Sequence, residues 1–183
     1  DTTRGAWYRG LRLVAIDDLP TVPETANNHA RESAQAIEAP VAVEGACDAE
    51  QYDYFKFTAA AGHRLSFEVL ARRLGSPLDP VLRLLDAAGR ELAYSDDEPA
   101  LGADCRLQYA FNVPGEYFLE LRDIRYLGGE KYRYRLRVGD YDILVSLDNR
   151  IDFLPATGDE QSAAKHLDSG IGHNLNFDNL LTP

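Results

Sequence analysis

Residues 131–138 read KYRYRLRV, a stretch in which cationic side chains alternate with apolar or aromatic ones. Successive side chains of a β-strand point to opposite faces of its sheet, so a period of two residues predicts a strand with one buried face. The side chains expected to point inward are Tyr132, Tyr134, Leu136 and Val138. Those expected to point outward are Lys131, Arg133, Arg135 and Arg137.

The same alternation recurs on the N-terminal side of this stretch, in residues 41–47, 65–69, 105–111 and 117–121. Turn residues separate these stretches, among them Gly62 and Gly89, and we expect Gly89 at positive φ in a hairpin. Residues 27–37 are the only segment with helical character here, and their sparse apolar residues predict one or two turns at most. Short alternating strands separated by regular turns predict an all-β, antiparallel β-sandwich.

The composition fits one soluble domain. The chain has 183 residues and a formal net charge of -11. This charge argues against binding to nucleic acid or to an anionic membrane surface, because both contacts depend on Lys and Arg. It suits a secreted protein and is compatible with a hard cation such as Ca²⁺. No apolar run approaches the roughly 18 to 20 residues that a membrane-spanning helix needs, and the absence of any Met favours a processed protein or a fragment.

The two ends of the chain differ from its middle. Residues 1–21 contain one strand-like stretch, WYRGLRLVAI, followed by a linker. We assign residues 22–139 to the sandwich and residues 140–183 to a C-terminal strand, YDILVSL, and an extended irregular tail. A tail with so little periodicity is either disordered or laid along another surface.

Several blocks follow one another in a recognisable order. They are ETANNHA at 24–30, AQAIEAPVAVEGAC at 34–47, YDYFKF at 52–57, RLGSPLDPVLRLLDAAGRELAYSDD at 73–97 and DCRLQYAFNVPGEYFLELRD at 104–123. In this order they resemble a bacterial pre-peptidase C-terminal domain, a relative of the collagen-binding domains of secreted clostridial collagenases. The last two blocks, through SPLDPVLRLLDAAGREL and PGEYFLELRD, are most similar to versions found in large planctomycete envelope and secreted proteins.

The resemblance covers roughly residues 22–139 and implies a jelly-roll-like sandwich that is attached to secreted enzymes or surface proteins and is not itself catalytic. Some members of the family bind collagen or polysaccharide. Several bind Ca²⁺ where the linker before the first strand meets the DxDYF start of a later strand.

The family's calcium motif is only partly present. Glu24 and Asn28 match its linker and Asp53 matches its strand, whereas Ala26, His29 and Gln51 replace acidic residues. The candidate calcium ligands are Glu24, Asn28 and Asp53, which match the motif, and Asp48, an additional carboxylate close by in sequence. The alternative is a network without metal, in which Asp53 accepts hydrogen bonds from the linker at 24–28 and the aromatic residues of QYDYFKF, at 51–57, anchor the core.

Two cysteines, Cys47 and Cys105, leave two options: a single disulfide in an oxidising compartment, or two buried thiols. The outward arginines Arg133, Arg135 and Arg137 also leave two options: docking to an acidic partner, or pairing with Asp and Glu on neighbouring strands. In the tail, the apolar residues Ile171, Leu175, Phe177 and Leu180 are candidates for docking.

The chain contains no GxSxG, HExxH, glycine-rich phosphate loop or CxxCH motif, and we predict no enzyme and no cofactor apart from the calcium alternative. The expected function is that of a structural or docking subunit of a larger extracellular protein assembly, located outside the cell, in the periplasm or at the cell surface. The alternative is an accessory module that binds polysaccharide or a fibrous protein. An exposed aromatic patch on one sheet face would favour the module, and a tail extended across a neighbour's surface would favour the subunit.

The tail generates a prediction. Residues after Pro155 lack strand periodicity, so a partner would have to offset the entropy lost when they become ordered. A chain truncated after Pro155 should therefore melt close to the temperature of the full chain but lose association, as measured by thermal unfolding and size-exclusion chromatography. A large fall in its melting temperature would make the tail part of the domain itself.

Overall fold

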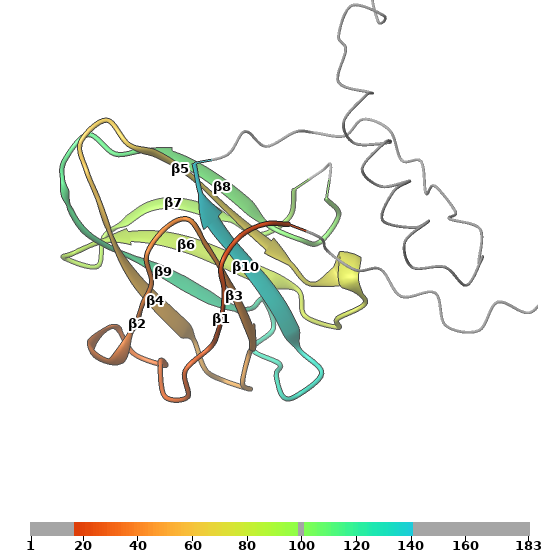
Figure 1. Ribbon diagram of the computed structural model, residues 1–183. Coiled ribbons are helices and arrows are strands. Elements are labelled where there is room, and N and C mark those ends of the chain that lie inside the picture. Colours follow the sequence, from red (N-terminus) through yellow and green to blue (C-terminus); the bar gives the residue numbers. More distant parts are fainter. Residues whose placement is uncertain (1–16, 99–100, 141–183) are drawn as a thin grey trace, which may run out of the picture. The chain divides into compact units, whose positions relative to one another are not determined.

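A computed structural model describes residues 17–98 and 101–140, and in it two five-stranded sheets pack face to face (Figure 1). The first sheet has the order β1 (Thr21–Pro23), β3 (Val41–Ala46), β10 (Arg133–Gly139), β5 (Arg64–Leu70) and β8 (Arg106–Ala110). The second has the order β2 (Gln35–Ala36), β4 (Asp53–Ala59), β9 (Gly115–Asp123), β6 (Pro80–Asp86) and β7 (Glu91–Ser95). The predicted all-β sandwich is confirmed.

Most strand pairs are antiparallel, and the two short N-terminal strands are the exception. β1 pairs in parallel with β3, and β2 pairs in parallel with β4. The chain leaves β1 in the first sheet, passes through η1 (Arg31–Ser33), one of two 3₁₀ turns in the described chain with η2 (Arg72–Leu74), and enters β2 in the second sheet. The linker at 24–30 therefore crosses one end of the sandwich. This one turn agrees with the one or two turns at most that were expected within 27–37.

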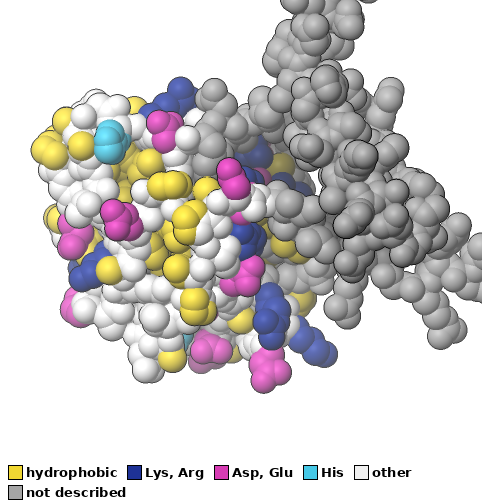
Figure 2. Space-filling view, in the orientation of Figure 1, with side chains coloured by type: hydrophobic (Ala, Val, Ile, Leu, Met, Phe, Trp, Pro, Cys, Tyr) yellow, Lys and Arg dark blue, Asp and Glu magenta, His cyan; other side chains and the backbone are white. Residues whose placement is uncertain are grey.

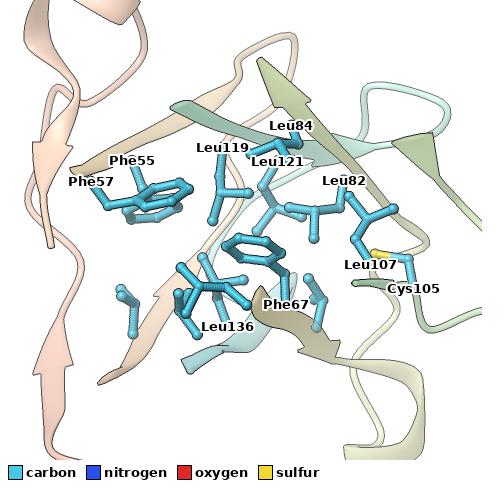
Figure 3. Close-up of a cluster of buried hydrophobic side chains, with 14 of the residues drawn as sticks. Phe55, Phe57, Phe67, Leu82, Leu84, Cys105, Leu107, Leu119, Leu121 and Leu136 are labelled. Atoms are coloured by element: carbon cyan, nitrogen blue, oxygen red, sulfur yellow. The ribbon is translucent and has the colours of Figure 1, made fainter. Parts of the chain in front are cut away.

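The core lies between the two sheets and consists of the inward side chains of both (Figure 3). Phe55 and Phe57 of β4 meet Phe67 of β5, and the rings of Phe57 and Phe67 lie 5.5 Å apart between their centres. Leu119 and Leu136 are fully buried between these rings and the remaining strands. The alternation that predicted the strands therefore also selects the residues that fill the core.

The stretch at 131–138 behaves as expected. Tyr134, Leu136 and Val138 are buried, whereas Arg133 is exposed on the other face of β10. Figure 2 shows acidic and basic side chains interspersed on the face turned toward the viewer. The expected hairpin joins β6 to β7, with Gly89 at φ 81°.

Cys47 and Cys105 are both buried free thiols, so the disulfide that the sequence left open is not formed. Cys47 follows β3 and Cys105 precedes β8, and β10 and β5 lie between these two strands. Three strand spacings separate the cysteines by about 14 Å. A disulfide needs Cα atoms within about 7 Å of each other, so no small adjustment would bridge them.

The chain enters and leaves the sandwich at the same end. Thr21 at the start of β1 pairs with Ala42, and Val138 near the end of β10 pairs with Val41, so both lie beside the start of β3. The linker at 24–30 lies at the opposite end, beside the end of β3. No helix within residues 17–98 or 101–140 is long and apolar enough to cross a membrane. The strand expected at 7–16 and the tail at 140–183 lie outside the described residues apart from Asp140.

Candidate functional site: a buried acidic cluster at one end of the sandwich

Three loops meet where β3 and β9 end and β4 begins, at the lower end of the sandwich in Figure 1. They comprise residues 24–30, 47–52 and 124–132. Each contains one non-glycine residue at positive φ: Asn27 at 74°, Glu50 at 60° and Tyr126 at 58°. No other non-glycine residue of the described chain has this conformation. Such backbone strain persists only where the surroundings impose it, and it is concentrated at functional sites.

Asp53, the first residue of β4, lies at the centre of these loops and is 1% exposed. Neither of its carboxylate oxygens accepts a hydrogen bond from any described residue. The Oδ1 atom of Asn28 and the hydroxyl of Tyr134 are also buried without a hydrogen bond to the described chain. Buried polar atoms are nearly always hydrogen-bonded because their desolvation is otherwise uncompensated. Unpartnered oxygens gathered in one place therefore mark a site that a ligand or a proton completes.

Two other buried aspartates show how this fold normally satisfies such groups. Asp104 accepts hydrogen bonds from the backbone N–H groups of Ala71, Arg72 and Arg73 and from the Arg73 side chain. Asp123 accepts three backbone hydrogen bonds of its own. Asp53 is equally buried and has none, so its state differs from theirs.

We call Glu24, Asn28, Asp53 and Tyr134 the acidic cluster, and Glu24 joins the linker to it. Its backbone N–H donates to the carbonyl oxygen of Glu44 at 2.8 Å, which continues the pairing of β1. Its carboxylate accepts hydrogen bonds from the backbone N–H of Ala46, at 3.0 Å, and from the side-chain amide of Asn28, at 3.2 Å. The side chains of Glu24 and Tyr134 occupy the space beside Gly45, where a Cβ atom would overlap both. A glycine at this position in β3 therefore makes room for the cluster.

The expected metal-free network is thus not the one observed. Asn28 donates to Glu24 and not to Asp53, because the amide faces the carboxylate of its own linker. The linker is tied to β3 through Glu24 and to β4 through the backbone, where Tyr54 N–H donates to the carbonyl of Asn28 at 2.8 Å. Asp53 remains enclosed between these contacts without accepting any of them.

This environment raises the pKa of Asp53 to about 8, first through burial and second through the negative charge of Glu24. The nearby Cys47 thiol and Tyr134 hydroxyl lower the Asp53 pKa in part, although neither makes a hydrogen bond of normal geometry to it. Burial and the charge of Asp53 in turn raise the pKa of Cys47 and of Tyr134 well above their usual values. A pKa of about 8 means that Asp53 binds a proton near neutral pH.

His29 separates Asp53 from Asp48. Its Nδ1 atom lies 3.4 Å from Oδ1 of Asp53, and its Nε2 atom lies 3.7 Å from Oδ2 of Asp48, whose side chain is 64% exposed. Of the four predicted metal ligands, Glu24, Asn28 and Asp53 are therefore brought together, whereas Asp48 lies on the solvent side of the imidazole.

The residues fit a hard cation in the kind of donor that they offer. Asp53 and Asn28 supply unpartnered oxygens, and Ca²⁺ takes six to eight oxygen ligands, water included. Within the described chain, no group of three or more His, Cys, Asp or Glu side chains surrounds a common point as a metal site would. A cation here would therefore rely on the Asp53 carboxylate, the Asn28 carbonyl and water, with Glu24 beside them.

Sequence reasoning missed a second feature of the same loops. Tyr52 is not part of the core, unlike Phe55 and Phe57. Its hydroxyl is hydrogen-bonded to that of Tyr126 at 3.1 Å, and the two rings meet edge to face with centres 5.8 Å apart. The guanidinium of Arg122 lies over the Tyr126 ring, 4.5 Å from its centre. We call Tyr52, Arg122, Ile124, Arg125, Tyr126 and Leu127 the tyrosine patch.

The sequence signal for this patch was the run IRYLGG at 124–129, which places large apolar residues where a turn normally carries polar ones. Ile124, Tyr126 and Leu127 are 38%, 40% and 42% exposed, and they are three of the five large hydrophobic residues exposed in the described chain. The exposed apolar surface is therefore concentrated in this one loop.

The outward arginines of β10 are largely paired within the domain. Arg135 contacts Asp17 and Glu44, each at 2.7 Å, and Arg137 contacts Asp17 at 3.2 Å and Glu68 at 2.9 Å. Arg133 makes no ion pair with any residue that the structure describes. The tail residues Ile171, Leu175, Phe177 and Leu180 lie outside the described residues, so docking through the tail stays a prediction.

Comparison with known proteins gives partial matches. No protein-family model matches the chain. Over 70 residues, 38% of this chain, it is 43% identical to a probable subtilase-type serine protease of Deinococcus radiodurans, and the match spans 9% of that protease. Among solved structures it is similar to the pre-peptidase C-terminal domain of a Bacillus anthracis collagenase, with a TM-score of 0.47 and 18% identity over 57% of this chain and 93% of that domain. It is also similar to Aeromonas hydrophila PliG, a periplasmic inhibitor of g-type lysozyme, with a TM-score of 0.41 and 18% identity over 66% of this chain and 95% of the inhibitor.

The state of Asp53 predicts how stability depends on pH. Its pKa in the folded chain is about 8, above the ordinary value of 3.8, so the folded state holds the proton more tightly than the unfolded state. This contribution to stability is complete at low pH and is lost as the pH rises between those two values. We expect the free energy of unfolding in EDTA to fall from pH 5 to pH 8, by at most about 1.4 kcal/mol per pH unit. Urea unfolding at a series of pH values measures this slope.

The matched variants are Asp53→Asn, which removes the titrating group, and Asp48→Asn, which removes an exposed carboxylate from the neighbouring loop. The slope should disappear in the first variant and persist in the second. A wild-type stability that stays level or rises over this pH interval would contradict the assignment.

Proposed function

We propose that this chain is a non-catalytic accessory module of a larger secreted protein, of the pre-peptidase C-terminal type, and that it docks this protein to a protein partner outside the cell. The observation that carries the proposal is the tyrosine patch, a rigid and exposed group of apolar and aromatic side chains at one end of the sandwich. Exposed apolar surface that is concentrated in one place marks contact sites in soluble proteins.

The size of the sequence match supports an accessory role. A segment similar to this chain makes up 9% of a probable subtilase-type protease, so a module of this kind accompanies a much larger protein in that case. The order of the sequence blocks at 24–123 supports membership of the pre-peptidase C-terminal family and residues 22–139 as the module. The resemblance to planctomycete versions and the location outside the cell belong to the same proposal.

The burial of the acidic cluster supports a non-catalytic role. Asp53 and Asn28 are each 1% exposed and Tyr134 is 4% exposed, so their unusual groups do not reach a substrate in solution. What they do contact is the linker and the start of β4, where the carbonyl of Asn28 accepts a hydrogen bond from the N–H of Tyr54. They therefore act on the conformation of this end of the domain and not on a bound molecule at its surface.

Docking is tested with the full chain. An affinity-tagged chain is recovered from the culture supernatant of its native source, the co-purifying protein is identified by mass spectrometry, and the complex is rebuilt from the two purified components. We expect a complex of defined stoichiometry by sedimentation. Failure to rebuild any complex, together with co-sedimentation of the chain with insoluble chitin, cellulose or peptidoglycan, would assign the module to polysaccharide instead.

A second function is favoured by the unpartnered oxygens of Asp53 and Asn28. We infer that Ca²⁺ binds there and stabilises the junction between the linker and β4. A ligand that binds only the folded state raises its stability by mass action. In millimolar Ca²⁺ the melting temperature should therefore rise by several degrees relative to EDTA. The rise should be larger at pH 8 than at pH 6, because a proton on Asp53 competes with the cation.

The rise should be abolished in Asp53→Asn and retained in Asp48→Asn, which differs from the wild type only at the exposed carboxylate. Calorimetric titration with Ca²⁺ gives an independent measure of binding. Equal melting temperatures in EDTA and in Ca²⁺ at both pH values would leave the proton as the only compensating charge and exclude the cation.

A further inference from the structure

We propose that the tyrosine patch is the docking surface itself and that it recognises an acidic protein surface with an apolar cleft, which accepts Tyr126 and Leu127. This inference rests on the proposed docking function and specifies its surface and the chemistry of its partner.

The loop that carries the patch is held rigidly from within. The buried carboxylate of Asp123 accepts hydrogen bonds from the backbone N–H groups of Arg125, at 2.9 Å, and Leu127, at 3.1 Å. Its second oxygen accepts a hydrogen bond from the N–H of Asp79, at 3.1 Å, which ties the loop to the start of β6. The N–H groups on both sides of Tyr126 are thereby oriented by a single side chain.

The neighbouring loop holds the same segment from outside. The N–H of Glu50 donates to the carbonyl of Tyr126 at 3.0 Å, and the N–H of Gly129 donates to the carbonyl of Cys47 at 2.8 Å. Gly128 lies against the backbone of residues 48–49 so closely that a Cβ atom would overlap it. These contacts keep Tyr126 at its positive φ and leave its ring partly exposed. Because the loop is already ordered, binding through it costs little conformational entropy.

The residues of the patch are those that dominate protein interfaces. Tyr and Arg are enriched at interface centres, where a few well-packed side chains supply most of the binding free energy. Tyr126 is supported on one side by Tyr52 and on another by Arg122, so it is an anchor with a fixed orientation. Ile124 and Leu127 extend the apolar area on either side of it in sequence.

The charge of the patch identifies an acidic partner. Arg122 donates to the backbone carbonyls of Asp123 and Ile124, and Arg125 is exposed. Neither arginine forms an ion pair with a carboxylate of the described chain, and the Asp123 carboxylate is occupied by backbone N–H groups. Residues 122–127 thus carry two arginines and one buried aspartate, a net charge of +1, on a chain whose net charge is -11. Asp48 and Glu50 are exposed on the neighbouring loop and mark the edge of this area.

Two other occupants fit less well. In a symmetric dimer of this chain the same patch would face itself, which would bring arginine against arginine. A polysaccharide would place hydroxyl groups against Ile124 and Leu127, which offer them no hydrogen-bond partner. An acidic polypeptide satisfies both the arginines and the apolar side chains.

The test uses the full chain and a phage-displayed library of random twelve-residue peptides. We expect the selected peptides to carry Asp or Glu next to an aromatic or large aliphatic residue. Their affinity, measured by calorimetry, should fall at least tenfold in Tyr126→Ala and in Arg125→Glu. It should remain unchanged in Val113→Ala, which truncates an apolar side chain that is 64% exposed at the other end of β9. Circular dichroism and thermal melting establish that each variant is folded. If Tyr126→Ala does not fold, Leu127→Ala serves as the second patch variant.

The inference is overturned if the selected peptides show no preference for acidic residues, or if they bind the patch variants as well as the wild type. It is also overturned if the wild-type chain binds a glycan array and the patch variants do not. The same holds if the wild-type chain forms a dimer that the patch variants dissociate. If Tyr126→Ala forms the complex with the identified partner equally well, the tyrosine patch is not the docking surface, although the docking function stands. The absence of any complex would remove the docking function itself.

Discussion

β10 lies between β3 and β5, and both layers of side chains around the first sheet depend on its register. Tyr134 reaches the acidic cluster, Leu136 fills the core, and Arg135 pairs on the outer face with Asp17 and Glu44. A slip by one residue would turn the apolar side chains outward and bury the arginines. The hydrophobic core and the outer ion pairs therefore specify the same register, one by burial and the other by charge.

Among the buried aspartates of the described chain, only Asp53 has an uncompensated cost of desolvation. Asp104 and Asp123 each organise a turn by accepting backbone hydrogen bonds, which compensates for their desolvation. Asp53 is enclosed by Glu24 and Tyr134 and is not compensated in this way. Because the folded state raises the pKa of Asp53, the stability of the junction between the linker and β4 depends on pH.

Alternation in the sequence was enough to predict the sandwich and its core, because the period of two that forms a strand also decides which side chains are buried. The grouping of Glu24, Asn28 and Asp53 followed from the resemblance. Strand order was not predictable from a local pattern, so the distance between Cys47 and Cys105 and the partners of the β10 arginines emerged only in three dimensions. The tyrosine patch was missed because loops have no period and the contact between Tyr52 and Tyr126 joins segments far apart in the sequence.

The chain enters β1 and leaves β10 at the same end of the sandwich, and the three strained loops lie at the other. The domain is therefore polar in the geometrical sense, with both covalent attachments at one pole and the exposed tyrosine at the opposite pole. In a protein that carried this domain on flexible linkers, both linkers would join it at one end, and the loops at the other end would be free to contact a partner. Tension along such a chain would pull on both attachments at the near pole and leave the distal loops outside the direct line of force.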